Sequence, residues 1–286
     1  DSNVPRKMTC CGLTANSWMR RLRQGIVVST LSTRTVVVDP VNAALLAALE
    51  DEDEVPDKRD DIKDMRKTFE GHLTKKGKED ADAIAVLDML LKEYEGCGPK
   101  DKADIVKSLQ KGFGLKRKEN RDGTAANTVA MASAVCLSKM APESVKSLNK
   151  LCFDKKVTSD PAVHRQVILS LGKTEDESAV DTLLKLTSSK DAKIQGAAIE
   201  SLGRFRAIDQ KERKEVCERL IKIIMPIKST VDSDSEDIIA RERYDVIGPP
   251  TITTLQKLTD QKIRDFQEWQ QWWNKNKRND WDEEED

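Results

Sequence analysis

Residues 160–172 read D-P-A-V-H-R-Q-V-I-L-S-L-G, and residues 191–203 read D-A-K-I-Q-G-A-A-I-E-S-L-G. The two stretches lie 31 residues apart, and apolar residues recur in both at the same helical spacing. Each stretch opens with an aspartate, Asp160 or Asp191, and aspartate is a favoured N-cap of helices. Pro161 stands at the first helical position of the first copy, where proline is well tolerated. The pattern predicts two copies of one helical unit.

A second apolar helix is predicted after each of these stretches. The two second helices supply Val180, Leu183, Leu184 and Leu186 in one copy and Val216, Leu220, Ile223 and Ile224 in the other. Two helices of about three turns each, joined by short turns, bury only one face of each helix and need neighbours to cover the rest. The sequence therefore predicts an all-α fold, an α–α superhelix of stacked antiparallel helix pairs.

Three residues are expected to end helices of these two copies. Gly172 and Gly203 follow the apolar stripes of the first helices, and we expect them to take the left-handed conformation in which glycine commonly ends a helix. Pro226 is expected to end the second helix of the second copy, because proline disrupts helix interiors.

Helical periodicity extends from the two clear copies in both directions. The predicted helix pairs are residues 81–111, 125–159, 160–190 and 191–225, preceded by a polar helix at 56–72. By continuity we expect a solenoid over residues 40–278, with a C-terminal cap at 236–278. Residues 1–39 show no sustained helical period and are predicted to be a poorly ordered extension, and residues 279–286 an acidic disordered tail.

The composition favours helices and shows no overall attraction for polyanions. Of 286 residues, 38% are hydrophobic, 35% are charged and only 4% are aromatic, with 13 Gly and 9 Pro. The 49 basic and 50 acidic side chains nearly cancel, so a nucleic acid would need a local basic patch. The basic runs at 116–118 and 275–278 are interpreted as solvated surface. No run of about 18 apolar residues occurs, so no membrane span is predicted.

Neither the cysteines nor the histidines form a pattern typical of a reactive or metal-binding site. The cysteines are Cys10, Cys11, Cys97, Cys136, Cys152 and Cys217, without the C-x-x-C spacing of zinc sites. We expect buried, reduced thiols, with a redox or acylation role left open for the adjacent Cys10 and Cys11. His72 and His164 lie far apart in the sequence, and His164 is expected to be an exposed helix residue. No catalytic residue, metal ligand or cofactor site is predicted.

The repeated stretch resembles the HEAT-like repeat of the phycobilisome-lyase type. That repeat has an Asp, a Val or Ile three positions later, and an Ala-rich helix that closes in Leu-Gly. The residues that carry this signature are Asp160, Pro161, Gly172, Asp191 and Gly203. The match is good over residues 160–224, fair over 125–154 and only helical in character before that. The resemblance implies a solenoid whose first helices form the convex side and whose second helices form the concave side.

The C-terminal segment carries a cluster of aromatic residues. Phe266, Trp269 and Trp273 fall at i, i+3 and i+7 on one helical face, and Trp272 lies off this stripe. Together with the preceding Leu-Thr-Asp turn at 258–260, the cluster resembles the terminal helix of certain bacterial HEAT-repeat proteins. We expect the stripe to cover the open end of the last repeat, as terminal repeats require. A ligand platform or interaction surface is the alternative role for the cluster.

Three functional classes of protein are built on HEAT-like repeats, and each has features that the sequence can be compared with. Iron-dependent hydroxylases of this kind hold their metals with His-Glu motifs, and none occurs in the sequence. Phycobilin lyases share only the repeat, and a fold does not carry a function. HEAT-like DNA glycosylases need a positively charged concave surface with aromatic residues, which the sequence does not indicate. The leading hypothesis is a non-enzymatic scaffold that receives a peptide or protein segment on the concave face formed by its second helices. A small enzyme or bilin lyase and a nucleic-acid-binding module are the alternatives.

Exposed polar residues on the second helices are the candidates for contact with a partner. They are Asp181, Lys185, Arg219 and Lys222. The sequence specifies neither the partner nor the oligomeric state. The chain begins at Asp1 rather than Met, so a signal segment can have been removed beforehand, and the sequence is compatible with a cytoplasmic or an exported protein.

Overall fold

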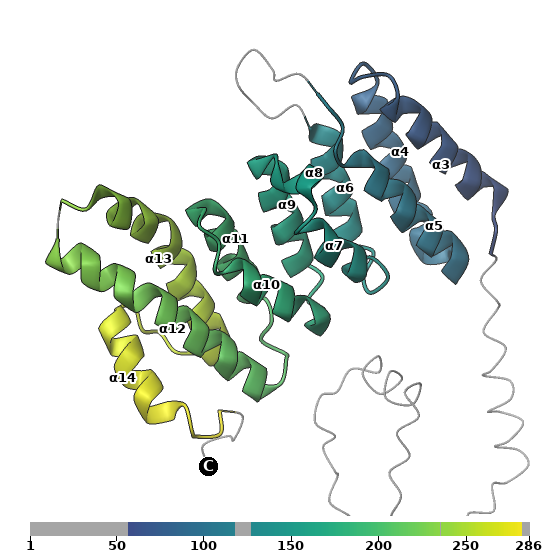
Figure 1. Ribbon diagram of the computed structural model, residues 1–286. Coiled ribbons are helices and arrows are strands. Elements are labelled where there is room, and N and C mark those ends of the chain that lie inside the picture. Colours follow the sequence, from purple (N-terminus) through teal and green to yellow (C-terminus); the bar gives the residue numbers. More distant parts are fainter. Residues whose placement is uncertain (1–56, 118–126, 235, 282–286) are drawn as a thin grey trace, which may run out of the picture. The chain divides into compact units, whose positions relative to one another are not determined.

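The computed structural model describes residues 57–117, 127–234 and 236–281 (Figure 1). Every regular element in these ranges is a helix, which confirms the predicted all-α class. The predicted N-terminal extension with Cys10 and Cys11, the start of the proposed solenoid before residue 57 and the end of the acidic tail lie outside the described residues.

The described helices keep the order that the apolar periodicity predicted. They are α3 (Asp60–Leu73), α4 (Asp80–Glu93), α5 (Pro99–Leu109), α6 (Thr128–Ser138), α7 (Val145–Leu151), α8 (Lys155–Thr158), α9 (Pro161–Gly172), α10 (Val180–Leu186), α11 (Ala192–Leu202), α12 (Gln210–Ser233), α13 (Ile238–Thr259) and α14 (Phe266–Asn276). Short 3-10 turns are η1 (Tyr94–Gly96), η2 (Gln110–Gly112) and η3 (Glu177–Ala179).

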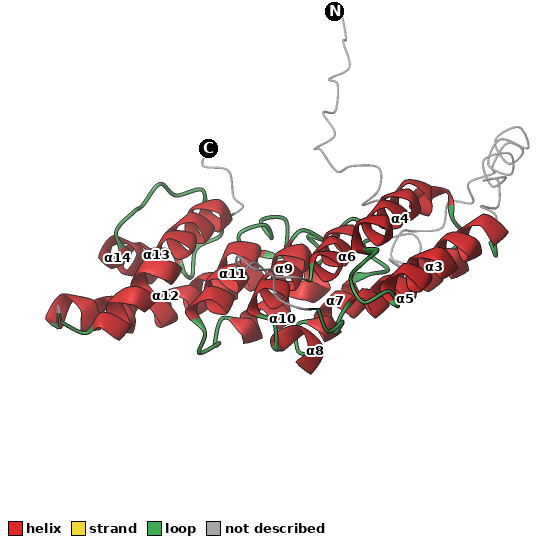
Figure 2. Ribbon diagram, turned by 90° about the horizontal axis from the view of Figure 1, so that it is seen from above, coloured by secondary structure: helices red, strands yellow, loops and turns green. Residues whose placement is uncertain are grey.

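The helices lie in two layers (Figure 2). The first layer contains the first helix of each pair, and α4, α6, α9, α11 and α13 each pack on the next. The second layer contains α3, α5, α7, α10 and α12. Helix α14 contacts α12 at the C-terminal end, and the short α8 contacts α9. This is the arrangement expected of stacked helix pairs, in which each pair covers the apolar face of its neighbour.

Apolar residues of both layers meet in one core. Leucines and isoleucines of successive helices are fully buried. The first layer contributes Leu87, Leu137, Ile168, Ile199 and Leu255, and the second contributes Ile105, Leu148, Leu183 and Leu220. Burial of each such side chain is worth about 1.5–3 kcal/mol. The repeated core therefore supplies the main driving force for stacking.

Aspartate side chains cap the N-termini of most helices from α8 onward. The Asp160 carboxylate accepts hydrogen bonds from the backbone N–H groups of Ala162 and Val163, and Asp191 accepts from Lys193 and Ile194. The same arrangement begins further elements at Asp154, Asp176, Asp209, Asp237 and Asp265. A cap of this kind is worth about 1 kcal/mol. The caps fix where each helix starts.

The two glycines of the repeat play a different role from the predicted one. Gly172 is the last residue of α9, and Gly203 follows α11 with a φ of −66°, so neither is left-handed. Instead, a Cβ atom on Gly172 would lie 2.5 Å from the Cβ atom of Ser201, and one on Gly203 would lie 2.8 Å from Thr254 Oγ1. Glycine is needed here because the next first-layer helix passes too closely for a side chain.

Hydroxyl groups bridge the same close approaches. Ser201 Oγ donates to the backbone oxygen of Ile168 at 3.1 Å, and Thr254 Oγ1 donates to the backbone oxygen of Ile199 at 2.7 Å. Ile168 and Ile199 occupy equivalent positions of α9 and α11. Each hydroxyl is buried, so its hydrogen bond avoids the cost of an unpaired polar group. One contact type thus joins α9 to α11 and α11 to α13.

The prediction that Pro226 ends a helix was wrong. Helix α12 continues through Pro226 to Ser233, and Thr230 Oγ1 donates to the Pro226 backbone oxygen at 3.1 Å. Proline removes one backbone hydrogen bond from the helix, but Pro226 lies on the exposed side, where water can hydrate the freed carbonyl. Packing of α12 along α13 holds the helix together beyond that point.

Substitution at the close approaches tests this account of the stack. We expect Gly172→Ala to lower the free energy of unfolding by about 1–3 kcal/mol, because the new Cβ atom would also lie 2.9 Å from the Ser201 Cα atom. Gly71→Ala is the matched control, since a Cβ atom there meets nothing within 4 Å. The control should stabilise α3 by about 0.5–1 kcal/mol. Chemical denaturation followed by circular dichroism measures both, and a Gly172→Ala protein as stable as wild type would contradict the account.

Candidate functional site

The four predicted contact residues line a single groove between α10 and α12. Asp181 and Lys185 come from α10, and Arg219 and Lys222 come from α12. The groove has a volume of about 440 Å³. Its remaining lining residues are Leu184, Ser188, Glu215 and Glu218. Residues of the two helices that are 34–41 positions apart in the sequence therefore face one space, although their role in binding stays a prediction.

The periodicity of the two helices explains why these side chains point outward. In α10, Val180, Leu183 and Leu186 are buried, so Asp181 and Lys185 occupy the opposite, exposed side. In α12, Val216 and Leu220 are buried in the same way, and Arg219 and Lys222 are exposed. The groove walls are thus the solvent faces of two core-packed helices, and their backbone positions are fixed by the core.

The groove carries charges of both signs. Arg219 donates to Ser188 Oγ at 2.6 Å, and this bond joins α12 to the turn that follows α10. Lys222 Nζ lies 2.9 Å from Glu218 Oε1. Near the start of α12, burial and the neighbouring carboxylates raise the pKa of Glu212. No residue lining the groove is a cysteine or histidine, and the arrangement is suited to binding through ion pairs rather than to covalent chemistry.

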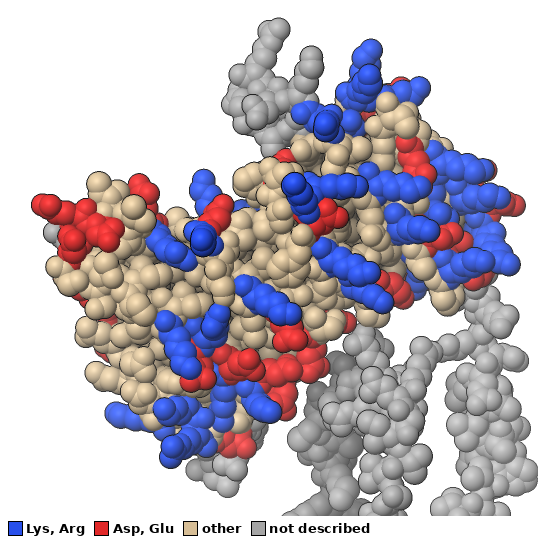
Figure 3. Space-filling view, in the orientation of Figure 1, with Lys and Arg blue, Asp and Glu red and all other residues tan. Residues whose placement is uncertain are grey.

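Lys and Arg side chains also continue beyond this groove. They follow the face formed by α5, α7, α10 and α12, with Asp and Glu side chains between them (Figure 3). A second groove of about 860 Å³ lies beside α7 and η3, and it includes Val145, Lys146, Lys150 and Phe153. The Phe153 side chain is 54% exposed. Its residues come from separate elements, so the sequence alone did not indicate this groove.

The aromatic residues of the C-terminal segment pack on the last two helices before it, with the Trp residues in contact with each other and the Phe266 ring against Tyr244 of α13. Phe266, Trp269 and Trp273 are buried, and the Trp269 and Trp272 rings meet edge to face with centroids 5.6 Å apart. Trp281 packs on Trp272 at 5.4 Å, and Lys214 Nζ of α12 lies 5.3 Å from the Trp281 ring centroid. This geometry supports the end-cap role, which we retain as a proposal.

His164 differs from its predicted placement. Its side chain is buried, and Nε2 lies 2.9 Å from the backbone oxygen of Cys152, so this nitrogen carries the hydrogen and donates. The prediction of an exposed residue was wrong because the short α8 packs over α9. The other histidine, His72, lies in α3 with Nδ1 2.8 Å from Glu79 Oε2.

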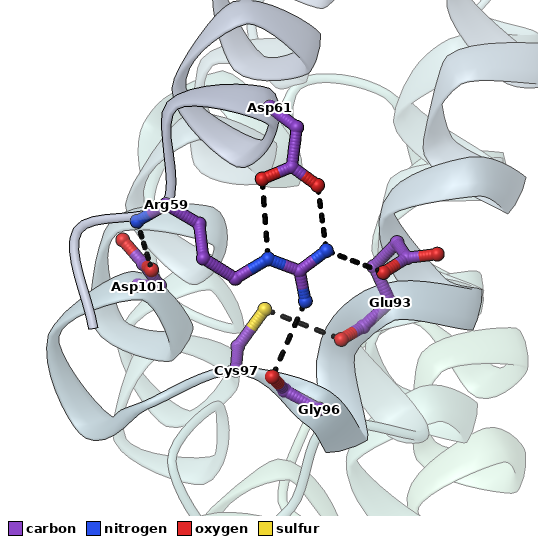
Figure 4. A network of polar contacts seen from close by, with 6 residues as sticks. All are labelled: Arg59, Asp61, Glu93, Gly96, Cys97 and Asp101. Carbon is purple, nitrogen blue, oxygen red and sulfur yellow. Dashed lines mark hydrogen bonds and ion pairs between the residues drawn. The ribbon is translucent and has the colours of Figure 1, made fainter. Parts of the chain in front are cut away.

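A polar cluster around Arg59 ties the start of α3 to α4 and η1 (Figure 4). The Arg59 guanidinium donates to both oxygens of Asp61, to Glu93 Oε2 at 2.7 Å and to the Gly96 backbone oxygen at 3.2 Å. The Arg59 backbone N–H donates to Asp101 Oδ2 at 2.9 Å. The bonds to Glu93, Gly96 and Asp101 link residues more than thirty positions apart, and we interpret the cluster as one that stabilises the packing of α3 on its neighbours.

The thiol beside this cluster is not an activated nucleophile. A guanidinium can lower the pKa of a neighbouring thiol. Cys97, however, is buried, its Sγ donates to the Glu93 backbone oxygen at 3.2 Å, and burial raises its pKa. Burial likewise raises the pKa of Cys136 to about 11 and those of Cys152 and Cys217 to about 12. All four are free cysteines.

The described ranges contain neither a metal-binding cluster nor a membrane-spanning helix. Between residues 57 and 281, omitting 118–126 and 235, no group of three or more His, Cys, Asp or Glu side chains is placed to hold a metal ion. Over the same part of the chain, no helix combines the length and the apolar character needed to cross a bilayer.

Comparison with known families agrees with the repeated architecture. Residues 155–225, from α8 into α12, match the family model for HEAT repeats. No significant match was found among curated proteins or among solved structures. The family match and the stacked helix pairs support a HEAT-like repeat protein.

The buried histidine predicts a pH dependence of stability. Burial lowers the pKa of His164, so the unfolded chain takes up this proton at a higher pH than the native protein does. The stability that the neutral imidazole provides is present above the unfolded pKa of about 6.5 and is lost as the pH falls below it. Chemical denaturation from about pH 7.5 to about pH 5 should show that the free energy of unfolding falls more steeply for wild type than for His164→Gln. Equal slopes for the two proteins would contradict this prediction.

The buried thiols predict a low reactivity in the native protein. In a Cys10→Ser/Cys11→Ser variant, we expect the remaining four thiols to react with Ellman's reagent only as fast as the protein opens, because they are buried with raised pKa values. The same variant in concentrated guanidinium is the control, where all four should react rapidly. A thiol that reacts at the unfolded rate in the native protein would show that one of these sites is accessible.

Proposed function

We propose that this protein is a non-enzymatic interaction scaffold that holds a segment of a partner protein against its second layer. HEAT repeats are generally protein-interaction scaffolds, and residues 155–225 match such repeats. The observation that carries the proposal is the groove between α10 and α12, in which Asp181, Lys185, Arg219 and Lys222 face one space.

The chemistry of the groove supports a protein ligand. The lining contains three acidic and three basic side chains beside Leu184, a combination that can pair with the mixed charges of a polypeptide. A polyphosphate backbone would instead meet repulsion from Asp181, Glu215 and Glu218. The backbone behind these side chains is fixed by the core, so binding requires little ordering of the scaffold itself.

The finer family assignment belongs to the same proposal. We retain the phycobilisome-lyase type for the repeat, because Asp160 and Asp191 occupy N-caps one repeat apart and a buried apolar stripe follows each of them. We also retain the terminal helix as the cap of the last pair. Neither assignment brings a cofactor, and the scaffold proposal does not depend on either.

Site-specific crosslinking tests the scaffold role. A photoreactive amino acid at Lys185 or Arg219, introduced into the protein in its native host, should capture the same partner protein from both positions. The matched control places it at Lys92, an exposed lysine of α4 in the first layer. Mass spectrometry identifies the products. Products identical for the groove and control positions, or none above background, would refute the proposal.

Charge reversal in the groove then measures how much the groove contributes to the affinity for the partner. We expect Lys185→Glu/Lys222→Glu to weaken binding of the captured partner roughly tenfold or more, equivalent to about 1.4 kcal/mol. Lys92→Glu should leave the affinity unchanged, because it makes the same type of change on the other layer. An affinity that the double substitution does not alter would place the contact elsewhere.

A further inference from the structure

The second layer repeats a short sequence as well as a fold. Residues 106–111 read V-K-S-L-Q-K and residues 145–150 read V-K-S-L-N-K, and residues 180–185 read V-D-T-L-L-K. The final lysine is exposed in each case, at Lys111, Lys150 and Lys185. Lys222 of α12 follows Leu220 at the same spacing and is also exposed. Successive second helices therefore present one lysine each on the same face.

The lysines of the second layer differ in whether a carboxylate of the protein already forms an ion pair with them. Lys111 Nζ lies 2.7 Å from Glu70 Oε2, and Lys222 Nζ lies 2.9 Å from Glu218 Oε1. Within the described ranges, Lys146 and Lys150 of α7 form no ion pair with a carboxylate. The helix α7 thus contributes two ammonium groups that remain available to a ligand.

An exposed aromatic ring lies beside these ammonium groups. Lys146, Lys150 and Phe153 stand at i, i+4 and i+7, so they lie on one side of α7 and its following turn. Leu148 and Leu151 already fill the core on the other side of the helix. The residue equivalent to Phe153 after α10 is Ser188, so the repeat does not need a large apolar side chain at this position. The ring is 54% exposed, so part of its apolar surface is open to contact by a ligand.

The acidic residues of the same groove are already engaged. Asp154 Oδ1 accepts from the Lys156 backbone N–H at 2.8 Å. Asp176 Oδ1 accepts from the Ser178 backbone N–H at 3.1 Å and from Ser178 Oγ. Both carboxylates are thus bonded to backbone N–H groups of the chain itself, whereas Lys146 and Lys150 form no ion pair within the described ranges. The groove therefore offers cations and an apolar surface, and its complement is anionic and apolar.

We propose that the groove formed by Lys146, Lys150 and Phe153 binds an extended acidic segment of a partner protein, with an apolar side chain of that segment seated on Phe153. The inference rests on the proposed scaffold function and specifies the chemistry of its partner. A protein segment fits better than a nucleic acid, because Asp181, Glu215 and Glu218 interrupt the basic face at the next groove.

Defined peptides test the chemistry of the ligand. Fluorescence anisotropy of the full chain is measured with a labelled eleven-residue peptide of Glu and Asp around a central Leu-Phe pair. Matched peptides replace Leu-Phe by Ala-Ala or replace every acidic residue by Lys, and single-stranded dT15 tests a nucleic acid. We expect the acidic Leu-Phe peptide to bind, the Ala-Ala peptide to bind about tenfold more weakly, and the lysine peptide not to bind. Binding of the acidic peptide should weaken as salt is raised.

Substitutions in the groove test its location. Phe153→Ser installs the residue that the next repeat carries, and Lys150→Glu reverses one free charge. Both substitutions should weaken binding of the acidic Leu-Phe peptide about tenfold, while Lys92→Glu on α4 should leave the affinity for this peptide unchanged. Circular dichroism and the midpoint of thermal unfolding verify that each variant is folded. An isosteric check, Lys150→Met, removes the charge without adding a negative one.

Several outcomes would overturn the inference. The proposed chemistry is wrong if no acidic peptide binds, or if the lysine peptide binds as tightly as the acidic one. The proposed location is wrong if neither Phe153→Ser nor Lys150→Glu weakens binding of the acidic peptide. Binding of dT15 that depends on the same residues would indicate a nucleic-acid ligand instead. Crosslinking from Lys185 and Arg219 reports on the scaffold role separately. It can succeed when the acidic peptides fail, so failure of this inference is distinguishable from failure of the proposed function.

Discussion

The close approach of successive first-layer helices is the constraint on which the rest of this structure depends. At Gly172 and Gly203 the chain has no side chain because the next helix occupies the space that a Cβ atom would need. Ser201 and Thr254 then donate hydrogen bonds across the same contacts to backbone oxygens one repeat earlier. A contact made of backbone, glycine and a short hydroxyl tolerates little variation. It sets the spacing and register of the stack before any surface residue matters.

The second layer is under weaker constraints, and the candidate binding surfaces lie there. Its helices contribute one apolar face to the core and leave the other face to solvent. At equivalent positions one repeat carries Ser188 where another carries Phe153, and Asp181 where another carries Lys146, and all four side chains are exposed. The first layer therefore fixes the geometry, and the second can vary its chemistry from one repeat to the next. Separation of these roles is consistent with a scaffold whose specificity is distributed along a face.

The sequence predicted what depends on local periodicity and missed what depends on neighbouring helices. Apolar spacing gave the helix order, and the aspartates at 160 and 191 indicated where two helices begin. Gly203 was misinterpreted because the sequence pattern, a glycine after an apolar stripe, is the same in two cases. The glycine can take a left-handed conformation that ends the helix, or it can leave room for a neighbouring helix. His164 was predicted to be exposed because nothing local reveals that α8 covers it. Pro226 was judged by intrinsic preference, which the packing of α12 on α13 overrides. The residues of the groove between α10 and α12 could be selected as exposed, but only the fold shows that they share one space.

The capping aspartates also change how the charge of this protein should be understood. The formal net charge of −1 counts every carboxylate equally. Seven aspartates in the described ranges, however, are bonded to backbone N–H groups at helix starts. The net charge is unchanged by these bonds, because the positive end of each helix dipole is matched by a negative end. The bonds do, however, hold these carboxylates at the starts of helices, whereas an exposed lysine without an ion pair can reorient on its flexible side chain. A charged ligand that approaches the described surface can therefore recruit such lysines at a lower cost than the capping carboxylates.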